Sequence, residues 1–334
     1  MRPRKILLPI VIALGMSTSA DVPACASCGC TLSADWENLS LSRSSGLKID
    51  LRYDYLNQNE LRSGTGTISA AAASQIVHQG EPQEVERYTR NQYLTATIDY
   101  SATPAWGIDL QIPYVFRNHS TLGTASNGSI PGAGGGQYDS DTSNLGDLKL
   151  ISRFQGFNAR HNFGLLFGLK FPTGSHTETG TSTDPTAPDP VPIDRGLQPG
   201  TGSTDIIAGA YYTDALDKNW DYFLQGLYQT AIATQDDYRP GDGVNLNAGI
   251  RFLDFKNLIP QMQLNARHVE HDSGGNADLF STGGTLLYLS PGVVVPVTRK
   301  ASVYGFVQVP LFQDVRGVQL APEYTVSIGV RMSF

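Results

Sequence analysis

The sequence lacks three features that would each indicate a different class of protein. Only 3 of its 334 residues are cysteine, and all 3 lie between residues 25 and 30, so no disulfide staples distant segments together. Beyond the N-terminal region no run of about 18 consecutive apolar residues exists, which excludes a transmembrane helix. The formal net charge is −7, whereas a nucleic-acid-binding protein needs a basic face. We therefore expect neither a helical membrane protein nor a nucleic-acid partner.

The N-terminus has the layout of a secretory signal peptide. Arg2, Arg4 and Lys5 precede an apolar run over residues 6–16, and small residues follow. Two cleavage sites fit, one at the end of residues 1–20 and one as late as residue 26. The mature protein is thus expected to leave the cytoplasm.

The C-terminus alternates between apolar and polar residues over its last eleven positions. Period two gives a strand with one apolar face and one polar face, long enough to cross a bilayer at a steep tilt. The ending also resembles the C-terminal signal that directs bacterial outer-membrane barrels to their assembly machinery. The residues that carry this expected assembly signal are Tyr324, Val326, Ile328, Val330, Met332 and Phe334.

Alternating segments of this kind recur along the whole chain from residue 46. Short and long connections alternate along the chain. The short ones lie near 101–105, 155–161, 215–218, 254–257 and 297–299, and the long ones include loops expected at 119–143 and 175–202. In lipid, a chain without apolar helices satisfies its backbone only in a closed barrel. The sequence therefore predicts an all-β protein, a transmembrane antiparallel up-and-down barrel of about 12 strands with short periplasmic turns and long extracellular loops.

The polar face of each predicted strand should line the lumen. Its charges nearly balance, so they suit either a salt-bridged filling that supports the wall or a narrow polar conduit. The expected lumen-lining residues are Lys48, Asp50, Arg52, Asp54, Asp99, Asp109, Asp147, Lys149, Arg153, Lys170, Asp205, Asp221, Arg251, Arg267 and Arg331.

A cysteine motif occupies residues 21–45, between the signal peptide and the barrel at 46–334. Cys25, Cys28 and Cys30 form C-x-x-C-x-C, and no histidine follows for haem attachment. Thiolates this close can bind a soft metal or form a disulfide in the periplasm. A metal at these cysteines is the one cofactor that the sequence suggests.

Five short motifs occur in order at 145–148, 168–174, 197–203, 240–242 and 307–313. Together they resemble the outer-membrane family associated with the meta-pathway of phenol degradation, which is distantly akin to fatty-acid and aromatic-hydrocarbon channels. The resemblance implies a channel in the outer membrane of a Gram-negative bacterium that takes up or exports small solutes, hydrophobic or aromatic ones included. Its expected partners are outer-membrane lipid, the barrel assembly machinery and the solute.

No catalytic arrangement accompanies these features. A Ser-His-acid set is not evident, and the two histidines at 268 and 271 lack the helical spacing of a zinc protease. We therefore expect a protein that is not an enzyme. The alternative to a channel is a barrel scaffold whose cysteine segment binds a metal or anchors a periplasmic partner such as a cytochrome.

Overall fold

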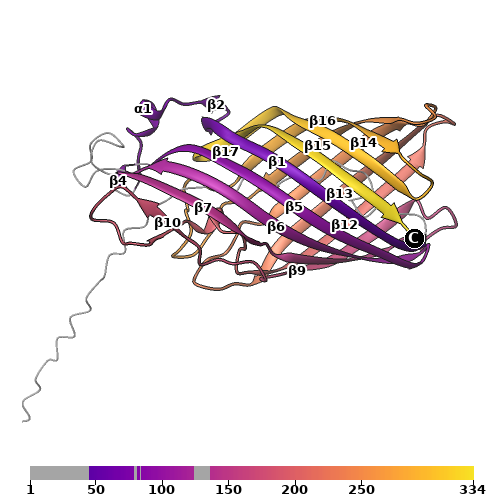
Figure 1. Ribbon diagram of the computed structural model, residues 1–334, viewed down its shortest axis with the longest axis horizontal. Helices are drawn as coiled ribbons and strands as arrows, with labels where there is room; N and C mark the ends of the chain where they lie inside the picture. The colour runs from indigo at the N-terminus through magenta and orange to yellow at the C-terminus, as the bar shows by residue number, and fades with distance from the viewer. Residues whose placement is uncertain (1–44, 79–80, 83, 124–135) are drawn as a thin grey trace, which may run out of the picture.

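The computed structural model describes residues 45–78, 81–82, 84–123 and 136–334 (Figure 1). Most of them lie in strands, and none of the helices among them is long and apolar enough to cross a membrane. The elements are β1 (Gly46–Gly64), β2 (Gly66–Thr67), α1 (Ala70–Ala73), β3 (Val77–His78), β4 (Glu81–Pro82), β5 (Val85–Thr103), β6 (Trp106–Leu122), β7 (Gln137–Leu145), β8 (Leu148–Phe154), β9 (Phe163–Phe171), β10 (Thr179–Ser182), β11 (Val191–Pro192), the 3-10 helix η3 (Arg195–Leu197), β12 (Thr204–Ala215), β13 (Trp220–Ala233), β14 (Gly243–Phe252), β15 (Ile259–Val269), β16 (Gly284–Pro296) and β17 (Ala301–Ser333).

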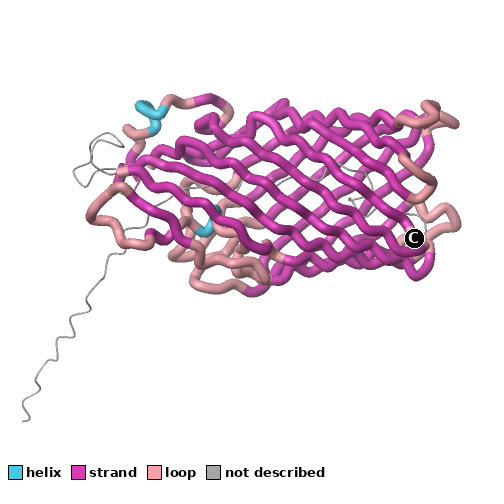
Figure 2. Tube along the Cα trace, in the orientation of Figure 1, coloured by secondary structure: helices cyan, strands magenta, loops and turns pink. Residues whose placement is uncertain are grey.

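The long strands form one antiparallel sheet that closes on itself. From β6 the order runs through β5, β1, β17, β16, β15, β14, β13, β12 and β9 to β8, and β8 pairs with β6 to complete the ring. Figures 1 and 2 show the strands wrapping around a common axis at a steep tilt. The all-β antiparallel barrel predicted from the sequence is confirmed.

The number of strands differs slightly from the expected twelve. The closed ring contains 11 elements, and β2, β7, β10 and β11 are attached to it. The difference arises because β17 replaces two predicted strands: its residues 302–315 pair with β16 and its residues 315–333 pair with β1. The backbone N–H of Ser333 donates to the carbonyl of Lys300 at 2.8 Å, so the two ends of β17 meet. β17 therefore doubles back near Gly317, whose φ of 61° is the left-handed conformation that glycine adopts readily.

The expected long loops are partly structured. β6 extends to Leu122 and β7 begins at Gln137, so the prediction of a loop over 119–143 is wrong at both ends. The segment 175–202 was expected to be irregular, but it contains β10, β11 and η3, and β10 pairs with β7. Polar residues dominate both regions. A prediction of strands from alternating apolar residues therefore did not include them.

The two ends of the barrel differ in how their strands are connected. The short connections at 104–105, 155–162, 216–219, 253–258 and 297–300 share the end where the C-terminus lies in Figure 1. We call it the short-turn end, and the opposite one the long-loop end. Phe334 is fixed at the short-turn end because its backbone N–H donates to the carbonyl of Leu47 at 2.9 Å.

Candidate functional site

The wall of the barrel has an apolar outer face and a largely polar inner face. In β17, Ile328 and Met332 are 55% and 48% exposed on the outer face, while the residue that precedes each of them, Ser327 and Arg331, is buried. All six residues of the expected assembly signal belong to this outer set or to the C-terminus itself, with Val326 half-buried. The interior of the barrel is therefore the candidate site.

The structure places all the charged residues expected in the lumen away from solvent. Asp50, Asp54, Asp99, Asp109, Asp147, Arg153, Lys170, Asp205 and Arg331 are buried, and Lys48, Arg52, Lys149, Asp221, Arg251 and Arg267 are half-buried. Most of them occur in pairs, such as Arg251 with Asp221 at 2.5 Å. Whether these residues line a conducting path remains a prediction.

One ionic cluster joins β1 and β17 near the short-turn end. Asp50 accepts from the Arg331 guanidinium at 3.1 Å and from the Tyr304 hydroxyl at 2.9 Å, and Arg331 stacks over the ring of Tyr304. On the same face, Asp54 accepts from Arg52 at 2.8 Å. Because these groups are shielded from water, their pairing is what makes their burial tolerable.

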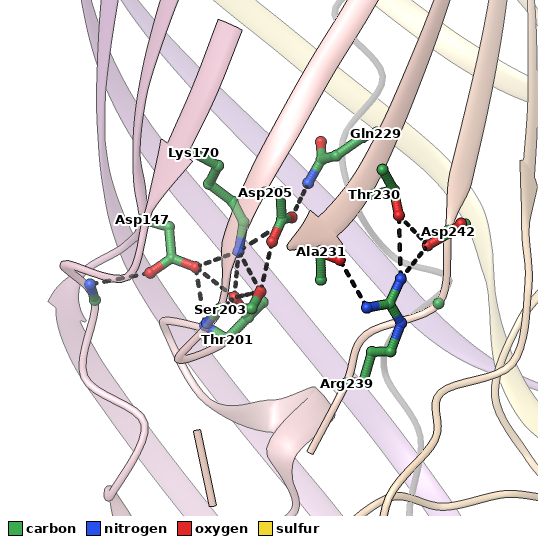
Figure 3. A network of polar contacts seen from close by, with 12 residues as sticks. Asp147, Lys170, Thr201, Ser203, Asp205, Gln229, Thr230, Ala231, Arg239 and Asp242 are labelled. Carbon is green, nitrogen blue, oxygen red and sulfur yellow. Dashed lines mark hydrogen bonds and ion pairs between the residues drawn. The ribbon is translucent and has the colours of Figure 1, made fainter. Parts of the chain in front are cut away.

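A second cluster is centred on Lys170 at the end of β9 (Figure 3). Its ammonium lies 2.9 Å from Asp147 and 3.3 Å from Asp205, and it also contacts the hydroxyls of Thr201 and Ser203. Asp147 in turn accepts from the backbone N–H of Thr201 at 2.9 Å. Lys170 thus links the connection between β7 and β8, which contains Asp147, to the segment that leads into β12, which contains Thr201 and Ser203.

Beside this cluster, Arg239 secures the loop between β13 and β14 (Figure 3). It donates to the carbonyl of Ala231 at 2.6 Å and forms an ion pair with Asp242 at 3.3 Å. Partial burial raises the pKa of the Asp242 carboxyl, but hydrogen bonds from Tyr228 and Thr230 and the charge of Arg239 outweigh it and lower the pKa below its usual range. Asp242 therefore stays ionised and holds this loop in place.

The segment over η3 contacts the inner face of β6. Arg117 of β6 donates to the carbonyls of Gly196 at 2.9 Å and Gln198 at 3.2 Å, and it also bonds Asn91 and Tyr93 of β5. Leu197, Gln198, Pro199 and Gly200 are buried against this part of the barrel. We call residues 195–201 the inner segment, because it is bonded to the inner face of the barrel through Arg117.

Arg117 was missing from the residues expected in the lumen, although the sequence contained a signal for it. It has the same parity along β6 as Asp109 and Gln111, whereas Phe116 next to it points outward and is 40% exposed. Its partners on the inner segment could not be anticipated, since 79 and 81 positions separate them from Arg117.

The inner face also has uncharged regions that the sequence reading missed. Gln225, Asn247, Asn265 and Ser290 form a hydrogen-bonded row across β13 to β16, with steps of 2.9, 2.8 and 2.6 Å. Next to this row lies an apolar cluster of buried side chains from β8, β9, β12 and β13, comprising Ile151, Leu166, Ile207, Tyr211 and Phe223. The inner wall thus contains ionic, neutral polar and apolar groups of side chains next to one another.

Cys25, Cys28 and Cys30, together with the expected signal peptide, lie outside the described residues. Metal binding at these cysteines and capture of a periplasmic partner both remain predictions.

Comparison with known proteins gives structural but not sequence relatives. No family model matches the chain, and no curated protein matches it either. An outer membrane channel from Pseudomonas putida F1 has a similar structure, with a TM-score of 0.58 at 16% identity over 88% of this chain and 97% of that one. The CymD monoaromatic hydrocarbon channel gives a TM-score of 0.50 at 11% identity over 87% and 89% of the two chains. At these identities the likeness establishes the fold, which is the barrel of outer-membrane channels.

Proposed function

We propose that this chain is an outer-membrane channel that passes small solutes through the lumen of its barrel. The observation that carries the proposal is the two-sided wall: a closed ring of strands with large apolar side chains exposed outside and polar side chains inside. A soluble barrel would expose this apolar surface to water at a high cost in free energy. Similarity in fold to two channels supports the same conclusion.

The proposal assigns an orientation to the barrel. The short-turn end faces the periplasm and the long-loop end faces the exterior, as is usual for outer-membrane barrels. Lipid covers the outer face between them. The inner segment then lies on the exterior side of the ionic clusters formed by Asp50 and Asp54.

The inner surface also bears on the size and class of the solute. The inner segment and the buried ionic clusters occupy part of the inner face of the barrel, so we expect only small solutes to pass. The apolar cluster around Phe223 and Tyr211 is buried, at 0% and 2% exposure, so an aromatic or other apolar solute packs on it only when the side chains around it move. CymD is a monoaromatic hydrocarbon channel, and we extend that class of solute to this chain as part of the proposal.

Purified protein in a planar bilayer tests this function. We expect discrete conductance steps, together with faster entry of a small aromatic solute such as toluene into proteoliposomes than into protein-free vesicles. The reference is a sample of the same protein unfolded and not refolded, which controls for detergent leaks. Well-folded, heat-modifiable barrel that gives neither steps nor solute entry would refute the channel.

A further inference from the structure

Two carboxylates lie directly opposite each other on the inner face near the short-turn end. Asp99 of β5 and Asp109 of β6 are partners in the antiparallel register, so their side chains leave the sheet on the same side. They are 7% and 2% exposed. Like charges in this position repel each other, and burial strengthens the repulsion because water no longer screens it.

The nearby arginine is bonded to only one of the two, and its charge acts on Asp109 at longer range. Arg153 of β8 donates to Asp99 at 2.8 Å and to the hydroxyl of Ser101 at 2.7 Å. It reaches across β6 over Gly107, where a Cβ atom would lie 2.3 Å from its Nη2. The absence of a side chain at Gly107 therefore directs Arg153 past β6 to β5, beyond Asp109.

Asp109 is left with an unsatisfied carboxylate oxygen. Its Oδ1 is buried and has no hydrogen-bond partner, and none of the ion pairs found among the described residues includes Asp109. The register pairs Lys48 with Asp99 and Lys149 with Gln111, so neither lysine lies directly opposite Asp109. A buried carboxylate in this state requires a positive partner or a proton.

We propose that Asp109, together with Asp99, forms a binding site for a small cation inside the lumen. The proposal rests on the channel function and adds a selectivity to it: the path favours solutes with a positively charged group over anions. The occupant is a monovalent inorganic cation or the ammonium group of a solute, since both provide one positive charge to a carboxylate oxygen. A multivalent metal is disfavoured because no group of three or more acidic, histidine or cysteine side chains among the described residues could hold one, and Arg153 adds a positive charge nearby.

Titration calorimetry on the folded, detergent-solubilised protein tests the site without relying on conduction. Potassium chloride and ethylammonium chloride serve as probes, and ionic strength is kept constant with the bulky salt tetrabutylammonium chloride. We expect saturable binding of at least one probe to the wild type and loss of that binding in Asp109→Asn. Binding of potassium alone assigns the site to inorganic ions, and binding of ethylammonium assigns it to solute ammonium groups.

Reversal potentials in a potassium chloride gradient test the consequence for transport. The potassium-to-chloride permeability ratio should fall about fivefold in Asp109→Asn, the factor that one charge gives at ~4 Å in a water-like medium. Asp254→Asn is the matched control, because it removes the same charge from an exposed turn at the same end of the barrel. Its permeability ratio should equal that of the wild type.

The outcomes separate this inference from the channel proposal. No saturable binding of either probe to the wild type, or equal binding in Asp109→Asn, would overturn the cation site and indicate that a proton neutralises Asp109. Binding that depends on Asp109 in a protein that never conducts would support the cation site and refute the channel. An altered permeability ratio in Asp254→Asn equal to that in Asp109→Asn would also count against the site.

Discussion

Replacing Arg117 by methionine should release the inner segment and widen the lumen. Arg117 is 8% exposed, and it is bonded to this segment through the carbonyls of Gly196 and Gln198. Methionine keeps much of the side-chain length and apolar stem but donates no hydrogen bond. The remaining contacts of the segment, including Arg195 with Asp236 at 2.9 Å, stay in place.

The size of the effect follows from the two lost bonds. A hydrogen bond from a charged donor contributes about 1.5–3 kcal/mol, and water recovers part of this when the segment moves away from β6. A net loss of about 1–3 kcal/mol would raise the population of a displaced segment by about 5–150-fold. The change is large enough to appear as a new conductance level.

Single-channel recording measures this population directly. We expect Arg117→Met to show larger or longer openings than the wild type, with the barrel still heat-modifiable. Arg267→Met is the matched control, because Arg267 is also a cation on the inner face, and its side chain donates to Asn245 at 3.2 Å instead of to the inner segment. If Arg117→Met conducts like the wild type, or if both variants change alike, Arg117 does not hold a constriction.

Three further predictions concern assembly, stability and the cysteine segment. Val330→Asp places a charge on the lipid-facing side of β17 and should cost up to a few kcal/mol, so that exported chain accumulates without heat-modifiable barrel on gels. Lys170→Met leaves Asp147 and Asp205 buried without their cation and should lower the free energy of unfolding by about 3–5 kcal/mol, measured by denaturant titration in detergent; an unchanged midpoint would contradict the role of Lys170. A variant with serine at both Cys28 and Cys30 should assemble normally but lose any metal or partner that the wild type binds, as checked by elemental analysis and pull-down, and identical results for both proteins would leave the segment without that role.

The sequence determined the class of the fold because each strand of a barrel wall requires apolar and polar residues at alternate positions. Every residue of a spanning strand faces either lipid or lumen, so neighbouring positions such as Ile328 and Ser327 must differ in polarity. The same alternation located the buried charges of the wall, including Asp50 and Arg331. None of these inferences needed a contact between distant parts of the chain.

The tertiary structure decided which charges pair and which one does not. Asp99, Asp109 and Arg153 looked equivalent in the sequence, since each simply occupies an inward position. Their difference depends on the register between β5, β6 and β8 and on the missing side chain at Gly107, which lets Arg153 pass over β6. Register is set by the closure of the whole ring, so a single strand does not reveal it.

The inner segment shows the same limit for the loops. Its residues 195–201 carry no apolar periodicity, and their place in the lumen depends on bonds to Arg117 and Lys170 from strands far away in the sequence. Local pattern therefore determined that this protein is a barrel with a polar interior. Only the packing of distant segments decided where the inner segment lies and that an oxygen of Asp109 has no hydrogen-bond partner, because both depend on contacts that form after the ring has closed.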